Sequence, residues 1–184
     1  MPALTIPERL SSIQAALQAD DYLVERSNVF TDIPAEQLYV PVAEDEMGRP
    51  YFMQLIFIND GGDESGASAE DVAFALLQFY ISFPLELSSG ALLEAGRLFH
   101  FVNQTLPLGF FGIMEVARRG SFRFVYPWQD IGERDLAVVR EVFDMTAVAV
   151  SRLAPLYNAI GAGKISAEQA IDDISRTGVF AGSP

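Results

Sequence analysis

Two runs of apolar, strand-forming residues constrain the fold of this chain most. Residues 51–58 and 72–83 are dominated by Phe, Tyr, Ile and Leu at both odd and even positions. A strand with one face in water alternates apolar and polar residues, whereas a run that is apolar on both sets is typical of a strand covered on at least part of both faces. We therefore predict that these two segments are the central strands of a sheet.

Helical and strand periodicity on either side of these runs gives the order of the remaining elements. A capping box at Thr5 and Glu8 predicts a first helix, and Pro107 ends a second helix that begins near Ser89. Gly161 follows a long third helix, and Ser166 can cap a short fourth one. The predicted order is α-β-β-β-β-α-β-β-α-α. The predicted helices end near residues 20, 106, 160 and 176, and the other predicted strands cover 22–29, 37–42, 109–117 and 121–126.

Length and composition limit the classes of protein that this chain can belong to. The chain has 184 residues and a net charge of −13 (12 basic minus 25 acidic), is 50% hydrophobic, and has no cysteine. Because half of the residues are apolar, we predict a folded chain, and its length predicts one domain. The absence of cysteine excludes disulfides, thiolate metal sites and cysteine nucleophiles. The acidic charge argues against binding to nucleic acid or an anionic membrane. No apolar run reaches the ~18 residues of a membrane span, and no basic segment with a long apolar run opens the sequence, so we expect a cytoplasmic protein.

The acidic segment 59–71 is the strongest candidate for a metal site. Asp60, Asp63 and Glu64 stand among glycines, and carboxylates on a flexible turn suit Ca²⁺ or Mg²⁺. The spacing does not match a twelve-residue calcium loop, so we favour a solvated connection between strands and no bound cofactor. The alternative is a divalent-cation-dependent enzyme or a small-ligand sensor that uses this loop. His100, the only histidine, is interpreted as a partly buried boundary residue because no nucleophile or orienting carboxylate lies near it in sequence.

Two further groups of residues are candidates for contacts with a partner. The hairpin between residues 109 and 126 is locally basic and carries Arg118, Arg119 and Arg123, which either neutralise the protein's own acidic loops or dock an acidic peptide. The third helix has a second apolar strip beside its main one, and this strip lies either in the core or in a partner or dimer contact. The strip consists of Val138, Val142, Met145 and Ala149.

The passage from Leu98 to Gly112 (LFHFVNQTLPLGFFG) resembles the YbjN-like family, which is similar in fold to the type III secretion chaperones. A helix ending in Asn103 leads through a Pro-Leu-Gly step into a hairpin, and an aromatic and arginine strand from Gly120 returns. Across residues 6–158, the resemblance implies an α+β domain with a curved antiparallel sheet flanked by helices, commonly dimeric and without known catalytic residues.

The resemblance also sets the domain boundaries and the expected function. We expect one chaperone-like domain over residues 1–160 and a short helical extension and tail over 161–184; the acidic insertion 59–66 and this extension depart from a typical secretion chaperone. The predicted function is that of a non-enzymatic homodimer that holds an apolar or extended segment of a protein partner. A large charge of one sign would keep such an apolar binding surface soluble.

Overall fold

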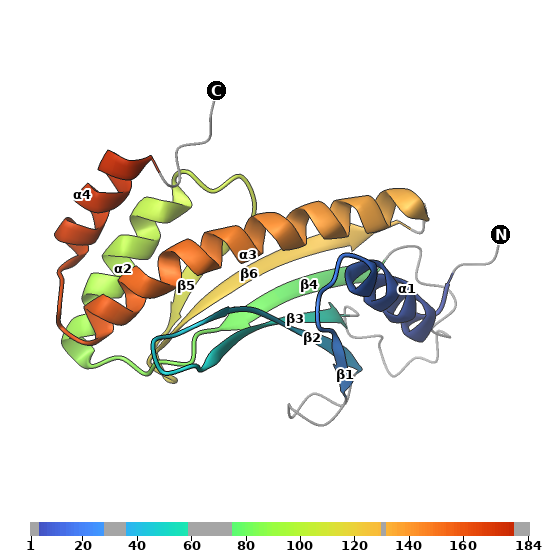
Figure 1. Cartoon of the computed structure of the whole chain (residues 1–184), viewed down its shortest axis with the longest axis horizontal. Helices are drawn as coiled ribbons and strands as arrows, with labels where there is room; N and C mark the ends of the chain where they lie inside the picture. The colour runs from blue at the N-terminus through green and yellow to red at the C-terminus, as the bar shows by residue number, and fades with distance from the viewer. Residues whose placement is uncertain (1–3, 28–35, 59–74, 130–131, 179–184) are drawn as a thin grey trace, which may run out of the picture.

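A six-stranded antiparallel sheet and four helices make up the fold in the computed structural model, which describes residues 4–27, 36–58, 75–129 and 132–178 (Figure 1). The α+β class is therefore confirmed. The strands lie in the order β1-β2-β3-β4-β6-β5, so the two predicted central strands occupy the central positions. The elements are α1 (Ile6–Ala19), β1 (Glu25–Ser27), β2 (Gln37–Glu44), β3 (Pro50–Ile58), β4 (Ala75–Ser82), α2 (Ser89–Asn103), β5 (Phe110–Met114), β6 (Arg119–Trp128), α3 (Glu133–Gly161) and α4 (Ala167–Thr177).

The helices of the described chain lie on one side of the sheet (Figure 1). The helix α3 runs along the sheet, with α1 at one end and α2 and α4 at the other. Leu77, Phe79 and Ile81 of β4 point into the core between sheet and helices and are fully buried. The other face is covered in part, since Ile56 is buried there while Phe52 is 39% exposed. Trp128 at the end of β6 is buried, with its ring 5.7 Å from that of Phe57.

Local signals account for most helix ends. Both predicted capping boxes are present, at Thr5 with Glu8 and at Ser166 with Gln169. The helix α2 ends three residues earlier than predicted, because the next backbone N–H groups bond to carbonyls three residues back and tighten the chain into turns. The helix α3 continues through Pro155 to Gly161, so this proline does not end it.

A cluster of aromatic rings joins the end of α3 to the sheet and to α2. The rings of Phe83 and Tyr157 are 4.8 Å apart, and those of Phe99 and Tyr157 stack at 5.7 Å. The hydroxyl of Tyr157 accepts a hydrogen bond from Gly120 N–H and donates one to the Leu85 carbonyl, both at 2.9 Å. This buried hydroxyl thereby fixes α3, β6 and the segment before α2 relative to one another.

The buried tyrosines predict a loss of stability at alkaline pH. Burial raises the pKa of Tyr157, and also that of Tyr51, to about 12 from the usual 10.0. The unfolded chain therefore loses these protons first, so the free energy of unfolding should fall as the pH rises from 10 towards 12. Urea unfolding at stepwise pH measures this. A Tyr157→Phe variant should show a smaller fall, and a stability that stays constant to pH 12 would contradict the prediction.

Candidate functional site

The three arginines of the predicted docking point do not form one cluster. Arg118 has a positive φ of 53°, and its Nε donates to the Leu87 carbonyl at 2.9 Å. Arg123 lies on the outer face of the sheet, where its Nε donates to Gln78 Oε1 at 2.8 Å. Arg119 shares that face at the beginning of β6. Within the described residues, which do not include the acidic segment 59–71, none of the three forms an ion pair with a carboxylate.

The second apolar strip of α3 lies largely in the protein's own core. Val142 is 2% exposed and Ala149 is 9% exposed, while Val138 packs partly buried against the core and Met145 is half-buried. The physical reason is that α1 and α2 pack against α3 in addition to the sheet, so a wide arc of α3 is covered within the chain. Val142 and Ala149 are therefore corrected from candidate partner contacts to core residues.

The other sequence-based candidates do not assemble a reactive site in the described part of the chain. Asp60, Asp63 and Glu64 lie outside the described residues. Within the residues that are described, no group of three His, Asp or Glu side chains is placed to hold a metal ion. None of the helices that the structure describes is long and apolar enough to cross a membrane. His100 is exposed rather than a boundary residue, with its Nε2 3.3 Å from the side-chain amide nitrogen of Gln104.

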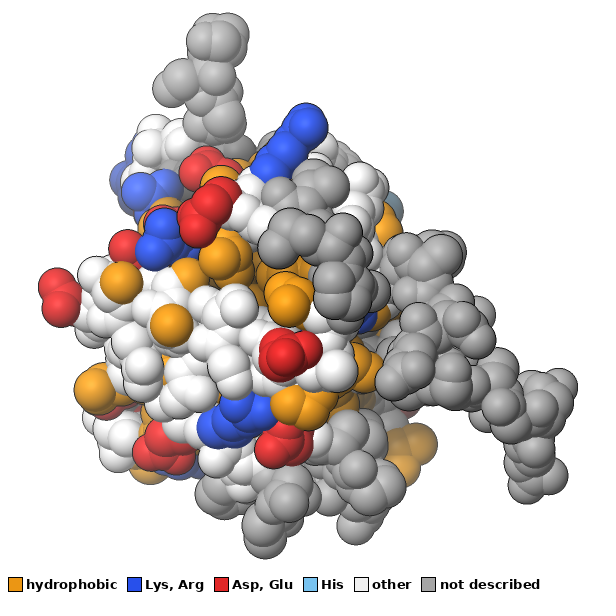
Figure 2. Space-filling model, turned by 90° about the vertical axis from the view of Figure 1, so that its right-hand side faces the viewer, with side chains coloured by type: hydrophobic (Ala, Val, Ile, Leu, Met, Phe, Trp, Pro, Cys, Tyr) orange, Lys and Arg blue, Asp and Glu red, His pale blue; other side chains and the backbone are white. Residues whose placement is uncertain are grey.

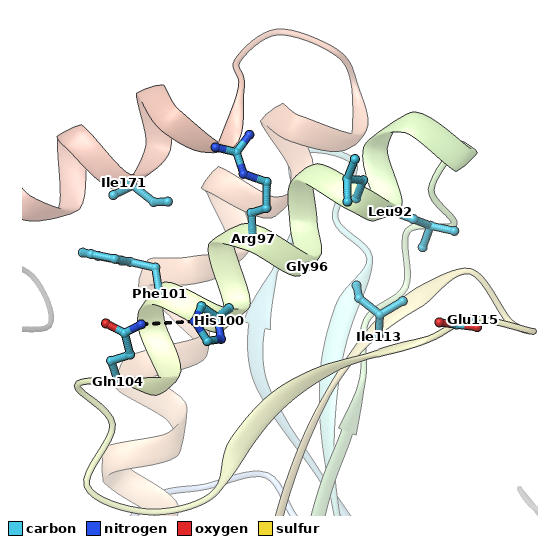
Figure 3. A pocket seen from close by; sticks show the side chains of 10 residues that line it. Leu92, Gly96, Arg97, His100, Phe101, Gln104, Ile113, Glu115 and Ile171 are labelled. Carbon is cyan, nitrogen blue, oxygen red and sulfur yellow. Dashed lines mark hydrogen bonds between the residues drawn. The ribbon is translucent and has the colours of Figure 1, made fainter.

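A surface groove of about 720 Å³ runs along the exposed side of α2, between β5 and α4 (Figure 3). We call it the α2 groove. Most of its lining surface is apolar. It is lined by Leu92, Leu93, Gly96, Arg97, His100, Phe101 and Gln104 of α2 and its C-cap, Ile113 of β5, Glu115 just after β5, and Ile171 of α4.

Charged groups lie at the margins of the α2 groove, whose floor is apolar. The guanidinium of Arg97 is 3.2 Å from Glu94 Oε1 and its side chain is 55% exposed. Glu94 in turn accepts a hydrogen bond from Ala167 N–H at 2.6 Å, and this bond holds the pKa of the Glu94 carboxyl below its usual value. A carboxylate at a helix N-terminus is favourable for the helix dipole, so Glu94 fastens the beginning of α4 to α2. Glu115 lies exposed at the opposite margin.

The edge strand beside the groove is partly closed to further strand pairing. The side-chain amide of Asn103 donates to the Phe111 carbonyl at 2.9 Å and accepts from the Phe111 N–H at 2.8 Å. These are the outward backbone groups of β5 that a neighbouring strand would use. The other edge strand, β1, has only three residues, and Arg26 within it bonds to Ser11 of α1. Both edges of the described sheet thus have features that limit strand addition.

Four of the nine exposed large apolar residues of the described chain lie on α2 or in and next to β5. Leu93 on α2 is 69% exposed, and Val116 after β5 is fully exposed. Leu108, before β5, and Phe110, within it, are exposed as well. Phe110 lies opposite Arg123 and shares the outer face of the sheet with it, and of these four residues only Leu93 lines the α2 groove. An exposed apolar residue at the wall of an apolar groove is typical of an interaction surface.

Analysis of the sequence missed the α2 groove because its walls come from segments far apart in the chain. The one local sequence signal was Leu93, an apolar residue within the helix predicted between Ser89 and Pro107. Comparison of the chain with family models, with curated proteins and with solved structures finds no match. The geometry of the α2 groove is therefore the basis of the functional argument.

Proposed function

We propose that this chain is a non-enzymatic protein-binding module that acts as a homodimer in the cytoplasm and holds an apolar segment of a partner protein. This is the role of the secretion chaperones that the YbjN-like sequence pattern resembles. The observation that carries the proposal is the α2 groove, with an apolar floor and exposed Leu93 and Val116 beside it. Burial of apolar area is the main favourable term in most protein association.

The state of the sheet edges supports side-chain burial as the mode of binding. Extended segments often bind by adding a strand to an exposed sheet edge. In this chain Asn103 already occupies the outward groups of Phe111, and β1 is short. A partner would gain more from filling the α2 groove with its side chains than from pairing its backbone with β5.

The acidic charge supports the proposal independently. A net charge of −13 keeps molecules apart in solution even when each one exposes an apolar groove. At the end of the molecule that carries α1, the described acidic and basic side chains are interspersed with apolar ones (Figure 2). Because of this repulsion, the protein can present the α2 groove to a partner while its molecules associate with one another less through their apolar surfaces.

Site-specific photo-crosslinking in cells tests the proposed binding surface. With benzoylphenylalanine in place of Leu93, we expect discrete protein adducts, because this position is 69% exposed at the groove. The matched control is the same residue in place of Val148, an apolar position of α3 that is 49% exposed but does not line the α2 groove. Adducts should disappear when Ile113→Asp is added. Equal adduct patterns from positions 93 and 148 would contradict the proposal.

Light scattering of the purified full chain tests the proposed homodimer directly. We expect a mass of twice 20.2 kDa at micromolar concentration. A strict monomer at high concentration would overturn the dimer, and the crosslinking result would then decide the binding role alone.

A further inference from the structure

We propose that the α2 groove binds an amphipathic α-helix of a partner protein, and that this helix has an acidic residue beside its apolar stripe. This inference rests on the proposed function. The surface of α2 has the geometry that a helix recognises. The edge of β5 beside the groove is partly closed to an extended segment. The exposed Arg97 on the α2 side, with Glu115 on the β5 side, favours an acidic residue on the side of the partner that faces α2. These three features are independent of one another.

The exposed face of α2 presents the four-residue holes into which side chains of a second helix insert. In helix pairs, a side chain of one helix packs between residues i, i+3, i+4 and i+7 of the other. Two successive sets with this spacing line the α2 groove, and Gly96 adds no side chain to the first one, where an added Cβ would lie 3.9 Å from Ile113 Cγ1 (Figure 3). The first set is Leu93, Gly96, Arg97 and His100, and the second is Arg97, His100, Phe101 and Gln104.

The neighbouring side of α2 already binds a helix, namely α4. The small and aliphatic side chains of Ala167, Ala170 and Ile174 are buried there, while the opposite face of α4 is polar. Ile171, between these residues and solvent, reaches the margin of the α2 groove (Figure 3). A second helix in the groove would extend this packing, with Ile171 on one side and Ile113 on the other. The stretch from Leu93 to Gln104 is about 17 Å long, which matches a helix of about 12 residues.

An extended segment would fit this place poorly. In an antiparallel strand, the N–H and carbonyl groups of every second residue point to the same edge. Because those of Phe111 point away from β6, the outward backbone groups of β5 belong to Phe111 and Ile113. Asn103 occupies those of Phe111. A segment beside β5 would therefore pair with Ile113 alone, too little to hold a strand.

The charged side chains of the α2 groove indicate which charge the partner helix should carry. Arg97 is the charged residue on the α2 wall of the groove and Glu115 the one on the β5 side. Glu94, outside the groove lining, bonds to Arg97 and Ala167, and the Arg97 side chain is still 55% exposed. An acidic residue on the partner helix would pair with Arg97 at the margin of the groove, where such pairs give specificity.

Stapled helical peptides and the full chain test this proposal. The first probe is a fluorescent helix of about 12 residues with leucine at positions i, i+3, i+4 and i+7 and a flanking glutamate. The second has lysine in place of glutamate, and the third is an extended peptide of the same composition that alternates apolar and polar residues. We expect the glutamate helix to bind most tightly, and the Arg97→Glu variant to weaken it about tenfold while strengthening the lysine helix. Arg152→Glu, a charge reversal on exposed α3 away from the groove, should change neither affinity.

The possible outcomes distinguish a failure of the inference from a failure of the proposed function. If the extended peptide binds as tightly as the helices, or if no helix binds, the inference is overturned, while adducts from position 93 would still support the proposed function. If position 93 crosslinks only to a second copy and Leu93→Asp dissociates a dimer, the groove is a contact between copies and the inference is also overturned. If neither adducts nor peptide binding appear, both the inference and the proposed function fail.

Discussion

Replacing Gly120 with alanine is expected to lower the free energy of unfolding by about 3 kcal/mol, because overpacking of a rigid core costs this order of energy. A Cβ atom at this position would lie 2.9 Å from Phe99 Cζ, 2.9 Å from Tyr157 Cε2 and 3.0 Å from Phe83 Cδ2. All three rings are buried and in contact with one another, so none can move aside without displacing the others. The displacement would also strain the hydrogen bond from Gly120 N–H to the Tyr157 hydroxyl.

Urea unfolding measures this loss, and Gly112→Ala is the matched control on the neighbouring strand. A Cβ at Gly112 would lie 3.8 Å from Ser121 Oγ, an ordinary contact. The control should change stability by less than about 0.5 kcal/mol. Equal unfolding midpoints for the two variants would show that the aromatic cluster around Gly120 can relax.

Features set by near neighbours in sequence could be predicted for this chain. Thr5 and Glu8 are three residues apart, so the start of α1 follows from the sequence. The central place of β3 and β4 follows from their apolar composition, because only covered strands are apolar at both sets of positions. The position of Asn103 at the end of α2 was part of the sequence pattern, but its bonds to Phe111 were not predictable, because they depend on the path of the chain through Pro107 into β5.

Features that depend on packing between distant segments could not be predicted. The burial of Val142 and Ala149 depends on α1 and α2 both packing against α3. The α2 groove requires Ile113 and Ile171 to meet α2 from opposite sides, across 58 residues of chain (171 − 113). The local sequence around Leu93 is the same whether or not residues of β5 and α4 form walls beside it. The existence of the α2 groove therefore depends on tertiary contacts, which the local sequence does not reveal.

Asn103→Ala is expected to lower the free energy of unfolding by about 2 kcal/mol and to open the edge of β5. The backbone N–H and carbonyl of Phe111, a residue only 2% exposed, would lose their partners, and unsatisfied buried polar groups cost about 1–3 kcal/mol. No other side chain of the described residues bonds to these two groups.

The open edge gives this prediction a second measurement besides urea unfolding. Outward backbone groups at both Phe111 and Ile113 would offer a template for strand pairing between molecules, so the Asn103→Ala variant should scatter more light on mild heating than the native chain. Gln104→Ala is the matched control, since the side chain of this exposed neighbour bonds only to His100 within the described chain and its loss should change stability by less than about 0.5 kcal/mol. A loss of stability without added scattering would mean that Asn103 supports packing but does not guard the edge. If neither changed, the clamp on Phe111 would have no energetic role, and strand addition at β5 would again compete with the α2 groove as the way a partner binds.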